Sequence, residues 1–307
     1  MSNFAFNNPA FQQQDPRNVA TYPGGPQAAQ GAAQSASLQN GATAAAANAH
    51  LEGVYASPSA GSIETDRMSV EDTVWKTAGL FGILLVTAAI GWVVTLGGLD
   101  VPAYSPNSTF EPNMLPWIAG ALGGFVLAMA IIFTSRKKVR PGLIFAYAAF
   151  EGLFIGGISA FFEVIYPGIV VQATLATVSV VGVTLALFAS GKIRASKKAT
   201  KVFMIAMIGY MVFSLLNVVL MWTGINDNAF GLLSGTIMGI PLGLIIGVLV
   251  VIMAAYSLVL DFDQIQQGVR NGAPRKLGWM GAFGIMVTVV WLYVEILRMI
   301  AIVRGSN

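Results

Sequence analysis

Residues 202–222 read VFMIAMIGYMVFSLLNVVLMW, a run of 21 residues without a charged side chain. A helix that crosses hydrocarbon satisfies its backbone polar groups internally and needs about 20 such residues. Six further runs of this kind lie near 74–97, 116–134, 143–163, 169–189, 237–263 and 278–303. The sequence therefore predicts an all-α integral membrane protein, folded as a bundle of seven transmembrane helices.

The composition supports the membrane class. Of the 307 residues, 55% are apolar and 10% are charged, whereas soluble domains average about 25% charged residues. The chain has no cysteine, and its single histidine, His50, precedes every apolar run. Disulfides, thiol zinc sites and metal sites of several histidines are therefore excluded, and Ser-His-Asp catalysis within the bundle is disfavoured. We expect no enzymatic activity and no bound cofactor.

Residues 1–68 are rich in Ala, Gln, Asn, Ser, Gly and Pro and show no apolar periodicity. Such a segment cannot bury enough apolar surface to offset its chain entropy, so the sequence predicts a disordered, low-complexity tail. An interaction role for this tail is the alternative. The bundle domain then covers residues 69–307, and Ser69-Val70-Glu71-Asp72 has the pattern of a helix cap at its start. The sixth apolar run opens earlier, near Ala229, and Pro241 predicts a kink or an interfacial lead-in there.

The basic residues indicate the orientation in the membrane. Twelve of the 17 Lys and Arg residues lie in three loops, at 136–140, 192–201 and 270–276, which follow the second, fourth and sixth spans. The loops after the first, third and fifth spans contain no Lys or Arg. Because basic loops stay in the cytoplasm, this pattern places the N-terminus inside and the C-terminus outside. Membrane topology also accounts for the net charge of +3, so the basic residues do not indicate a nucleic-acid partner.

Five acidic residues lie within the predicted spans, where ionisable groups are costly and usually functional. They are Glu151 and Glu163 in the third span, Asp261 and Asp263 in the sixth, and Glu295 in the seventh. The base predicted to face them is Arg298. An excess of acids inside a bundle indicates shared protons or a bound cation.

Helical periodicity predicts which acids face other helices. Gly235, Gly239, Gly243 and Gly247 form a small-residue stripe of the kind that admits a neighbouring helix. At about 100° per residue, Asp261 returns to the face of Gly243, whereas Asp263 is turned away toward the cytoplasmic end. Gly281, Gly284, Thr288 and Glu295 share one face of the seventh span.

Each of the other acids has a structural alternative to a functional role. Glu163 and Arg298 both lie near the outer ends of their helices, which predicts an ion pair between them. Asp263 is an acid near a helix end beside Arg270. Glu151, near the middle of its span, is either functional or a protonated acid bonded to a neighbouring helix.

Two short motifs resemble those of the Bax inhibitor-1/YccA family. The run Leu260-Asp261-Phe262-Asp263-Gln264-Ile265 is similar to the family's sixth-helix motif, and Trp291-Leu292-Tyr293-Val294-Glu295-Ile296 is similar to its seventh-helix motif. Glu151-Gly152-Leu153 resembles the third-helix pattern, and Asn8-Pro9-Ala10-Phe11 is similar to the start of actinobacterial members. The resemblance covers about residues 70–303.

Membership would imply a pH-sensitive calcium leak in a bacterial cytoplasmic membrane, governed by the acids that match the motifs, Asp261 and Glu295. Two close carboxylates do not both ionise cheaply, so the pair would share a proton or bind calcium, which prefers oxygen ligands. Glu295 stands where the family usually has Asp. Counted from the cytoplasmic ends, Asp261 lies about 10 Å and Glu295 about 25 Å deep, so Glu151 is the better partner by depth alone.

Two other function classes compete with the leak. A non-conducting regulator of a membrane partner, such as a membrane-bound protease, would use the same fold. An intramembrane enzyme is disfavoured, because the Gly-x-Gly-Asp pattern of aspartyl proteases and a serine–histidine pair are both absent from the spans. The expected partners are lipid, calcium and protons, together with a membrane protein if the regulator reading holds.

Overall fold

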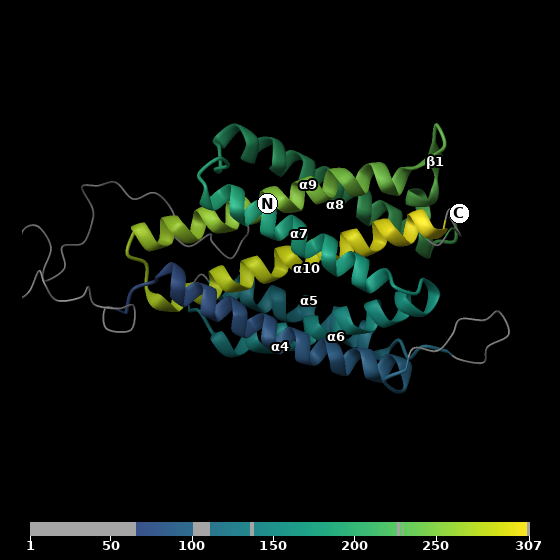
Figure 1. The fold of residues 1–307 in the computed structure, drawn as a ribbon, viewed down its shortest axis with the longest axis horizontal. Helices are drawn as coiled ribbons and strands as arrows, with labels where there is room; N and C mark the ends of the chain where they lie inside the picture. The colour runs from purple at the N-terminus through teal and green to yellow at the C-terminus, as the bar shows by residue number, and fades with distance from the viewer. Residues whose placement is uncertain (1–65, 101–110, 136–137, 226–227, 229, 306–307) are drawn as a thin grey trace, which may run out of the picture.

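The computed structural model describes residues 66–100, 111–135, 138–225, 228 and 230–305 (Figure 1). In these residues, seven helices are long and apolar enough to cross a membrane. They are α4 (Val70–Leu96), α5 (Leu115–Ser135), α6 (Pro141–Ile165), α7 (Ile169–Ala189), α8 (Lys197–Trp222), α9 (Leu242–Arg270) and α10 (Gly278–Gly305). The prediction of an all-α, seven-span membrane protein is confirmed. The tail predicted for residues 1–68 lies outside the described residues up to residue 65.

Helix α10 runs through the middle of the bundle, with α4, α5 and α6 on one side and α8 and α9 on the other, while α7 crosses α10 in this view (Figure 1). It packs against α9, α4 and α7, while α6 packs against α4 and α5. Helix α8 lies at the edge, and among its residues Phe203 and Asn217 are the buried ones. The site is expected on α9 and α10, which carry the buried acids Asp261 and Glu295.

The segment before α9 corrects the expectation for the sixth span. A 3-10 turn, η4 (Gly231–Ser234), leads into a hairpin of β1 (Thr236–Ile237) and β2 (Ile240–Pro241), and α9 begins only after Pro241. Met238 and Gly239 both have positive φ, as a two-residue hairpin loop requires. Gly235 and Gly239 thus lie outside the helix, and the predicted stripe is reduced to Gly243 and Gly247. These two face α10, because an added Cβ would meet Ile302 and Met299.

The closest helix packing lies elsewhere, between α4 and α6. A Cβ added at Gly152 would collide with Thr87 and the backbone oxygen of Leu84, and one at Gly156 would collide with the backbone of Ala88. Small residues at such positions let two helix backbones approach each other. The register of α4 on α6 therefore depends on these two glycines.

Replacing Gly156 by alanine is expected to lower the thermal stability of the bundle by about 1–3 kcal/mol, because backbone atoms of α4 cannot yield to the added methyl group. Gly79→Ala on α4 is the matched control, since an added Cβ there meets nothing within 4 Å. Helix propensity alone makes that change neutral or stabilising. Thermal unfolding in one detergent compares the two variants, and equal midpoints would contradict the close α4–α6 contact.

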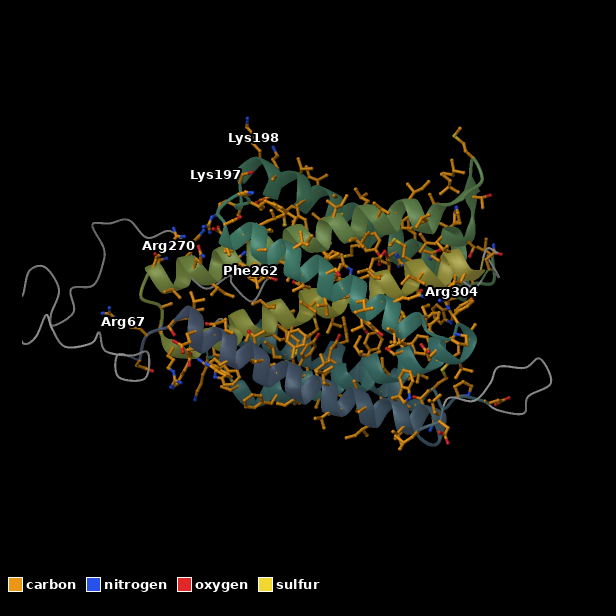
Figure 2. All side chains as sticks on the ribbon, viewed as in Figure 1. Arg67, Lys197, Lys198, Phe262, Arg270 and Arg304 are labelled. Atoms are coloured by element: carbon orange, nitrogen blue, oxygen red, sulfur yellow. The ribbon has the colours of Figure 1, made fainter. Side chains whose placement is uncertain are left out.

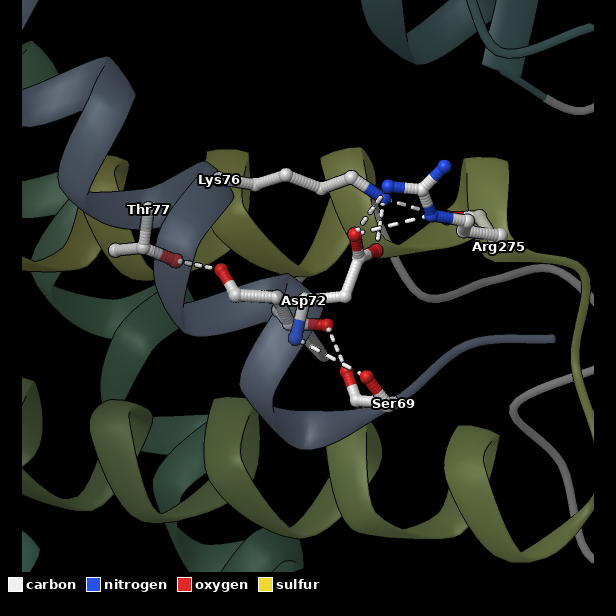
Figure 3. A network of polar contacts seen from close by, with 6 residues as sticks. Ser69, Asp72, Lys76, Thr77 and Arg275 are labelled. Atoms are coloured by element: carbon white, nitrogen blue, oxygen red, sulfur yellow. Dashed lines mark hydrogen bonds and ion pairs between the residues drawn. The ribbon is translucent and has the colours of Figure 1, made fainter. Parts of the chain in front are cut away.

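One end of the bundle is joined by a polar network (Figure 3). Ser69 caps α4 by accepting a hydrogen bond from the amide of Asp72, which confirms the predicted cap. The Asp72 carboxylate pairs with Lys76 and also accepts from Arg275 Nη2 at 2.8 Å, on the 3-10 turn η5 (Arg275–Leu277). Lys76 Nζ donates to the backbone oxygen of Arg275 at 2.8 Å. The start of α4 is thereby fastened to the α9–α10 loop.

The segment just before α4 joins the same loop. Met68 is buried, and its amide donates to Ala273 at 2.7 Å, while the Arg275 amide donates to Asp66 at 2.8 Å. Residues 66–68 are thus part of the bundle, although the sequence placed the domain boundary after residue 68. Backbone pairing rather than an apolar run holds this segment against the loop.

Deleting residues 1–65 is expected to leave membrane insertion and thermal stability of the bundle nearly unchanged, because the pairing with residues 273–275 begins at Asp66. Expression yield and the unfolding midpoint of the truncated chain measure this. Deletion of residues 1–69 is the contrasting variant, and it should destabilise the bundle because it removes Met68 and the Ser69 cap. A large loss with the shorter deletion would show that the tail packs on the helices.

The basic residues gather at one end of the bundle. Figure 2 places Arg67, Lys197, Lys198 and Arg270 at one end and Arg304 at the opposite end. The described loops that follow α7 and α9 therefore share a side, as their charge predicted.

Candidate functional site

Asp261 is the most deeply buried acid of the bundle. It lies in the third turn from the C-terminal end of α9, and its exposed fraction is 0%. Thr288 of α10 donates a hydrogen bond from Oγ1 to Asp261 Oδ2 at 2.7 Å, and Ser257 Oγ lies 3.5 Å from the same threonine hydroxyl. The predicted face of Asp261 is right, because Gly243, Gly247 and Asp261 all meet α10. A carboxylate, two hydroxyl groups and a tight helix contact thus form one buried polar cluster, the Asp261 cluster.

Glu295 forms a second buried cluster on α10. Its exposed fraction is 3%, and it accepts a hydrogen bond from the Tyr210 hydroxyl of α8 at 3.1 Å. It also pairs with Arg298, one turn further along the same helix. The Arg298 Nε atom is buried without a hydrogen-bond partner among the described residues. Glu295 therefore has a basic partner inside the bundle.

The structure places the two motif acids at different levels. Asp261 lies beside Thr288, and Glu295 follows Thr288 by seven residues, which is about 10 Å along the helix. The described partner of Asp261 is on α10, whereas those of Glu295 are Tyr210 on α8 and Arg298. This agrees with the depth counted from the sequence and does not support a directly shared ligand site on the two carboxylates.

Glu151 is also directed away from Asp261. Its Oε2 atom lies against Gly124 of α5, 3.0 Å from where a Cβ of that glycine would stand. Its other contact is the Tyr147 hydroxyl, one turn earlier on α6. Glu151 thus lies at the α5–α6 contact and is hydrogen-bonded within its own helix, whereas the structural alternative expected a bond to a neighbouring helix.

The predicted outer ion pair between Glu163 and Arg298 does not form. Glu163 instead accepts hydrogen bonds from the backbone amides of Gly168 and Val170, the latter at 3.0 Å. These amides open α7 and have no partner within the helix, so a carboxylate satisfies them. Arg298 pairs with Glu295. Glu163 lies two residues from the end of α6, whereas Arg298 lies seven residues from the end of α10, so the two side chains stand at different levels.

Asp263 has a local role. Gln267 donates to its carboxylate at 2.8 Å, and Arg270 donates to Gln266 instead. Asp263 was expected as an acid near the helix end beside Arg270, and its hydrogen bond is to Gln267 of the same helix. The side chain is partly exposed, on a different face of α9 from Asp261.

Two residues that the sequence analysis did not single out, Tyr210 and Ser257, belong to these clusters, and a third, Lys76, belongs to the separate network with Asp72 at the start of α4. Tyr210 stands in the otherwise apolar run 202–222, where a phenol that is buried usually has a hydrogen-bond partner. Ser257 precedes Asp261 by four residues, a spacing that places two side chains on the same face of a helix. Lys76 is a second base within a span and is 8% exposed. A search for every polar residue inside the spans, rather than for acids alone, finds all three.

The residues present do not build a resident calcium site. Calcium takes six to eight oxygen ligands, often several carboxylates. Among the described residues, no group of three or more His, Cys, Asp or Glu side chains stands together. The Asp261 cluster offers one carboxylate and two hydroxyl groups, and Arg298 already neutralises Glu295. The described residues therefore offer fewer oxygen ligands than a resident calcium ion takes.

The fold and site define a polytopic membrane protein with buried acids on its sixth and seventh spans. A family model described as Bax inhibitor 1 like matches residues 8–305. The chain belongs to this family. The match begins well before residue 70, so it includes most of the segment predicted as a low-complexity tail. Comparison with curated proteins returns no match, and comparison with solved structures returns none.

Proposed function

We propose that this protein is a calcium leak pathway whose conducting state depends on the protonation of Asp261. The observation that carries the proposal is the Asp261 cluster, a fully buried carboxyl group hydrogen-bonded by Thr288 between two helices of a membrane bundle. No catalytic role and no cofactor are part of the proposal.

The physical argument concerns the cost of charge. Burying an ionised carboxylate away from water costs free energy, whereas burying the neutral acid costs much less. The stability of the contact between the enclosing helices therefore depends on the protonation state of the acid. Thr288 donates to the carboxyl group from α10. Ionisation of Asp261 would favour water or a cation beside it and therefore a looser α9–α10 contact. Protons and calcium would in this way compete for one group.

The proposed location is the cytoplasmic membrane, with the N-terminus inside and the C-terminus outside. Its support is the gathering of basic residues at one end of the bundle (Figure 2). Reporter fusions are expected to place Lys138 and Lys198 in the cytoplasm and Gly168 outside. A fusion at Gly168 that reports from the cytoplasm would contradict this orientation.

Calcium flux into liposomes that contain only the purified full chain tests the proposal. We expect the wild-type protein to leak calcium at a rate that changes with pH, and protein-free liposomes give the baseline. Wild-type protein that conducts no calcium at any pH would overturn the leak. The non-conducting regulator of a membrane partner would then be the function to test next.

A further inference from the structure

A long apolar groove runs between α4 and α7, with α10 as its floor. Its cytoplasmic half is a cavity of about 640 Å³ that extends from Val70 to Ile285. A second cavity of about 690 Å³ continues it toward Trp92 and Tyr293. The two halves share Phe81, Thr177, Val178 and Val289. Each half is within the size range of small-molecule sites, about 300–1,000 Å³.

The groove faces the hydrocarbon. Val74, Val178 and Leu185 line it, and their exposed fractions are 59%, 63% and 49%. In water such a surface would be a liability, but in a bilayer it meets acyl chains. Helices α4 and α7 each pack on α10, which keeps the sides of the groove in place.

Two arginines stand at the cytoplasmic end of this groove. Gln266, which lines the cavity, accepts a hydrogen bond from Arg194 Nη1 at 2.8 Å and another from Arg270 Nη2 at 3.0 Å. The guanidinium of Arg194 also stacks 4.4 Å from the ring centroid of Phe188, a residue of the cavity wall. Both arginines are exposed, and within the described part of the chain neither forms an ion pair. The guanidinium groups of Arg194 and Arg270 thus both donate to the neutral side-chain oxygen of Gln266.

We propose that this groove binds an anionic phospholipid of the cytoplasmic leaflet. The phosphate would take the place above Gln266 between Arg194 and Arg270, and one acyl chain would lie along α7 past Phe188 toward Gly182. Guanidinium groups suit phosphate because their planar forks donate two hydrogen bonds at once. Anionic lipids are attracted to basic residues at the cytoplasmic surface. The inference does not depend on calcium leak.

The charge at the end of the groove favours a lipid over its rivals. An apolar partner helix would fill the groove but leave the two arginines unmatched. A free phosphate would match the arginines but leave about 640 Å³ of apolar groove unused. A lipid satisfies both parts, since it carries its charge and its chain in one molecule.

Native mass spectrometry of the full chain in detergent, with phosphatidylglycerol or phosphatidylcholine added, tests the proposal. We expect the wild-type protein to retain one phosphatidylglycerol in preference to phosphatidylcholine. Arg194→Gln with Arg270→Gln should weaken phosphatidylglycerol by about thirtyfold, because each basic residue near an anionic lipid contributes about fivefold. Lys197→Gln with Lys198→Gln is the matched control. It removes the same charge at the same end of the bundle, but from α8 (Figure 2).

The acyl-chain half of the site needs its own variant. Gly182 lines the groove, and a Cβ added there meets nothing within 4 Å, so Gly182→Trp fills the groove without a clash. We expect it to weaken both lipids, whereas Gly209→Trp at an equally open position of α8 should weaken neither. The proposal is overturned if both lipids bind the wild type equally, if the lysine control matches the arginine variant, or if Gly182→Trp has no effect. Full displacement by glycerol phosphate alone would show an anion site without a lipid, and would also overturn it.

Discussion

Replacing Asp261 by asparagine is expected to make calcium leak largely independent of pH, because an amide does not exchange a proton as a carboxyl group does. Asparagine keeps the size of the side chain and can still accept the hydrogen bond from Thr288, but it cannot ionise. The change therefore separates charge from packing. Flux of calcium into liposomes at a series of pH values measures the effect.

The adjacent acid supplies the control for this experiment. Asp263→Asn removes the same charge two residues away, from a partly exposed side chain bonded to Gln267. It should leave the pH profile unchanged. Glu151→Gln should also retain the response, because that carboxylate lies against Gly124 of α5. If Asp261→Asn still leaks calcium with an unaltered pH profile, the proposed role of Asp261 protonation is wrong, although the protein remains a calcium leak.

Glu295→Gln belongs in the same series, because the family resemblance pairs this acid with Asp261. The structure gives Glu295 its own base, Arg298, and places it about 10 Å further along the bundle. We therefore expect Glu295→Gln to alter stability more than pH response. A flattened pH profile in Glu295→Gln would show that the two acids are coupled after all.

Replacing Arg298 by methionine is expected to destabilise the bundle by about 3–5 kcal/mol. Methionine keeps the length and apolar volume of the side chain, but the change leaves Glu295 buried without its cation, and an uncompensated buried charge is costly. Thermal unfolding of the full chain in detergent measures the loss. The double variant Arg298→Met, Glu295→Gln should recover most of it, because both charges are then gone.

Arg304→Met is the matched control for the pair. Arg304 lies six residues further along α10, near its C-terminal end, and donates to the backbone oxygen of Pro167 at 2.9 Å. We expect only a small loss from this change, as is usual for polar contacts at a surface. If Arg298→Met is no less stable than Arg304→Met, the Glu295–Arg298 pair does not lie in a shielded interior.

Much of the site follows from helical periodicity. The face of Asp261 and its contact with α10 were predictable, because a rotation of about 100° per residue relates it to Gly243. The pairing of Glu295 with Arg298 is also local, since the two are one turn apart and such neighbours meet on a helix surface. The sequence analysis missed it by assigning Arg298 to Glu163.

The amino-acid sequence by itself determined the membrane class, the seven spans and the family. Hydrocarbon offers no hydrogen bonds, so every crossing needs about 20 apolar residues, and that requirement is visible in a single run such as 202–222. Charge in the loops is equally local and predicted which loops share a side.

Only the tertiary structure decided which helices are neighbours. Glu163 and Arg298 both lie in the C-terminal halves of their helices, yet one caps α7 and the other pairs along α10. A helix presents several faces, and a position along one helix does not select the neighbouring helix. The contact of Tyr210 with Glu295 joins residues 85 positions apart. Asp72 and Arg275 are 203 positions apart, and they meet only because α4 and α10 pack side by side. Such contacts depend on packing between helices, which the pattern within one helix does not contain.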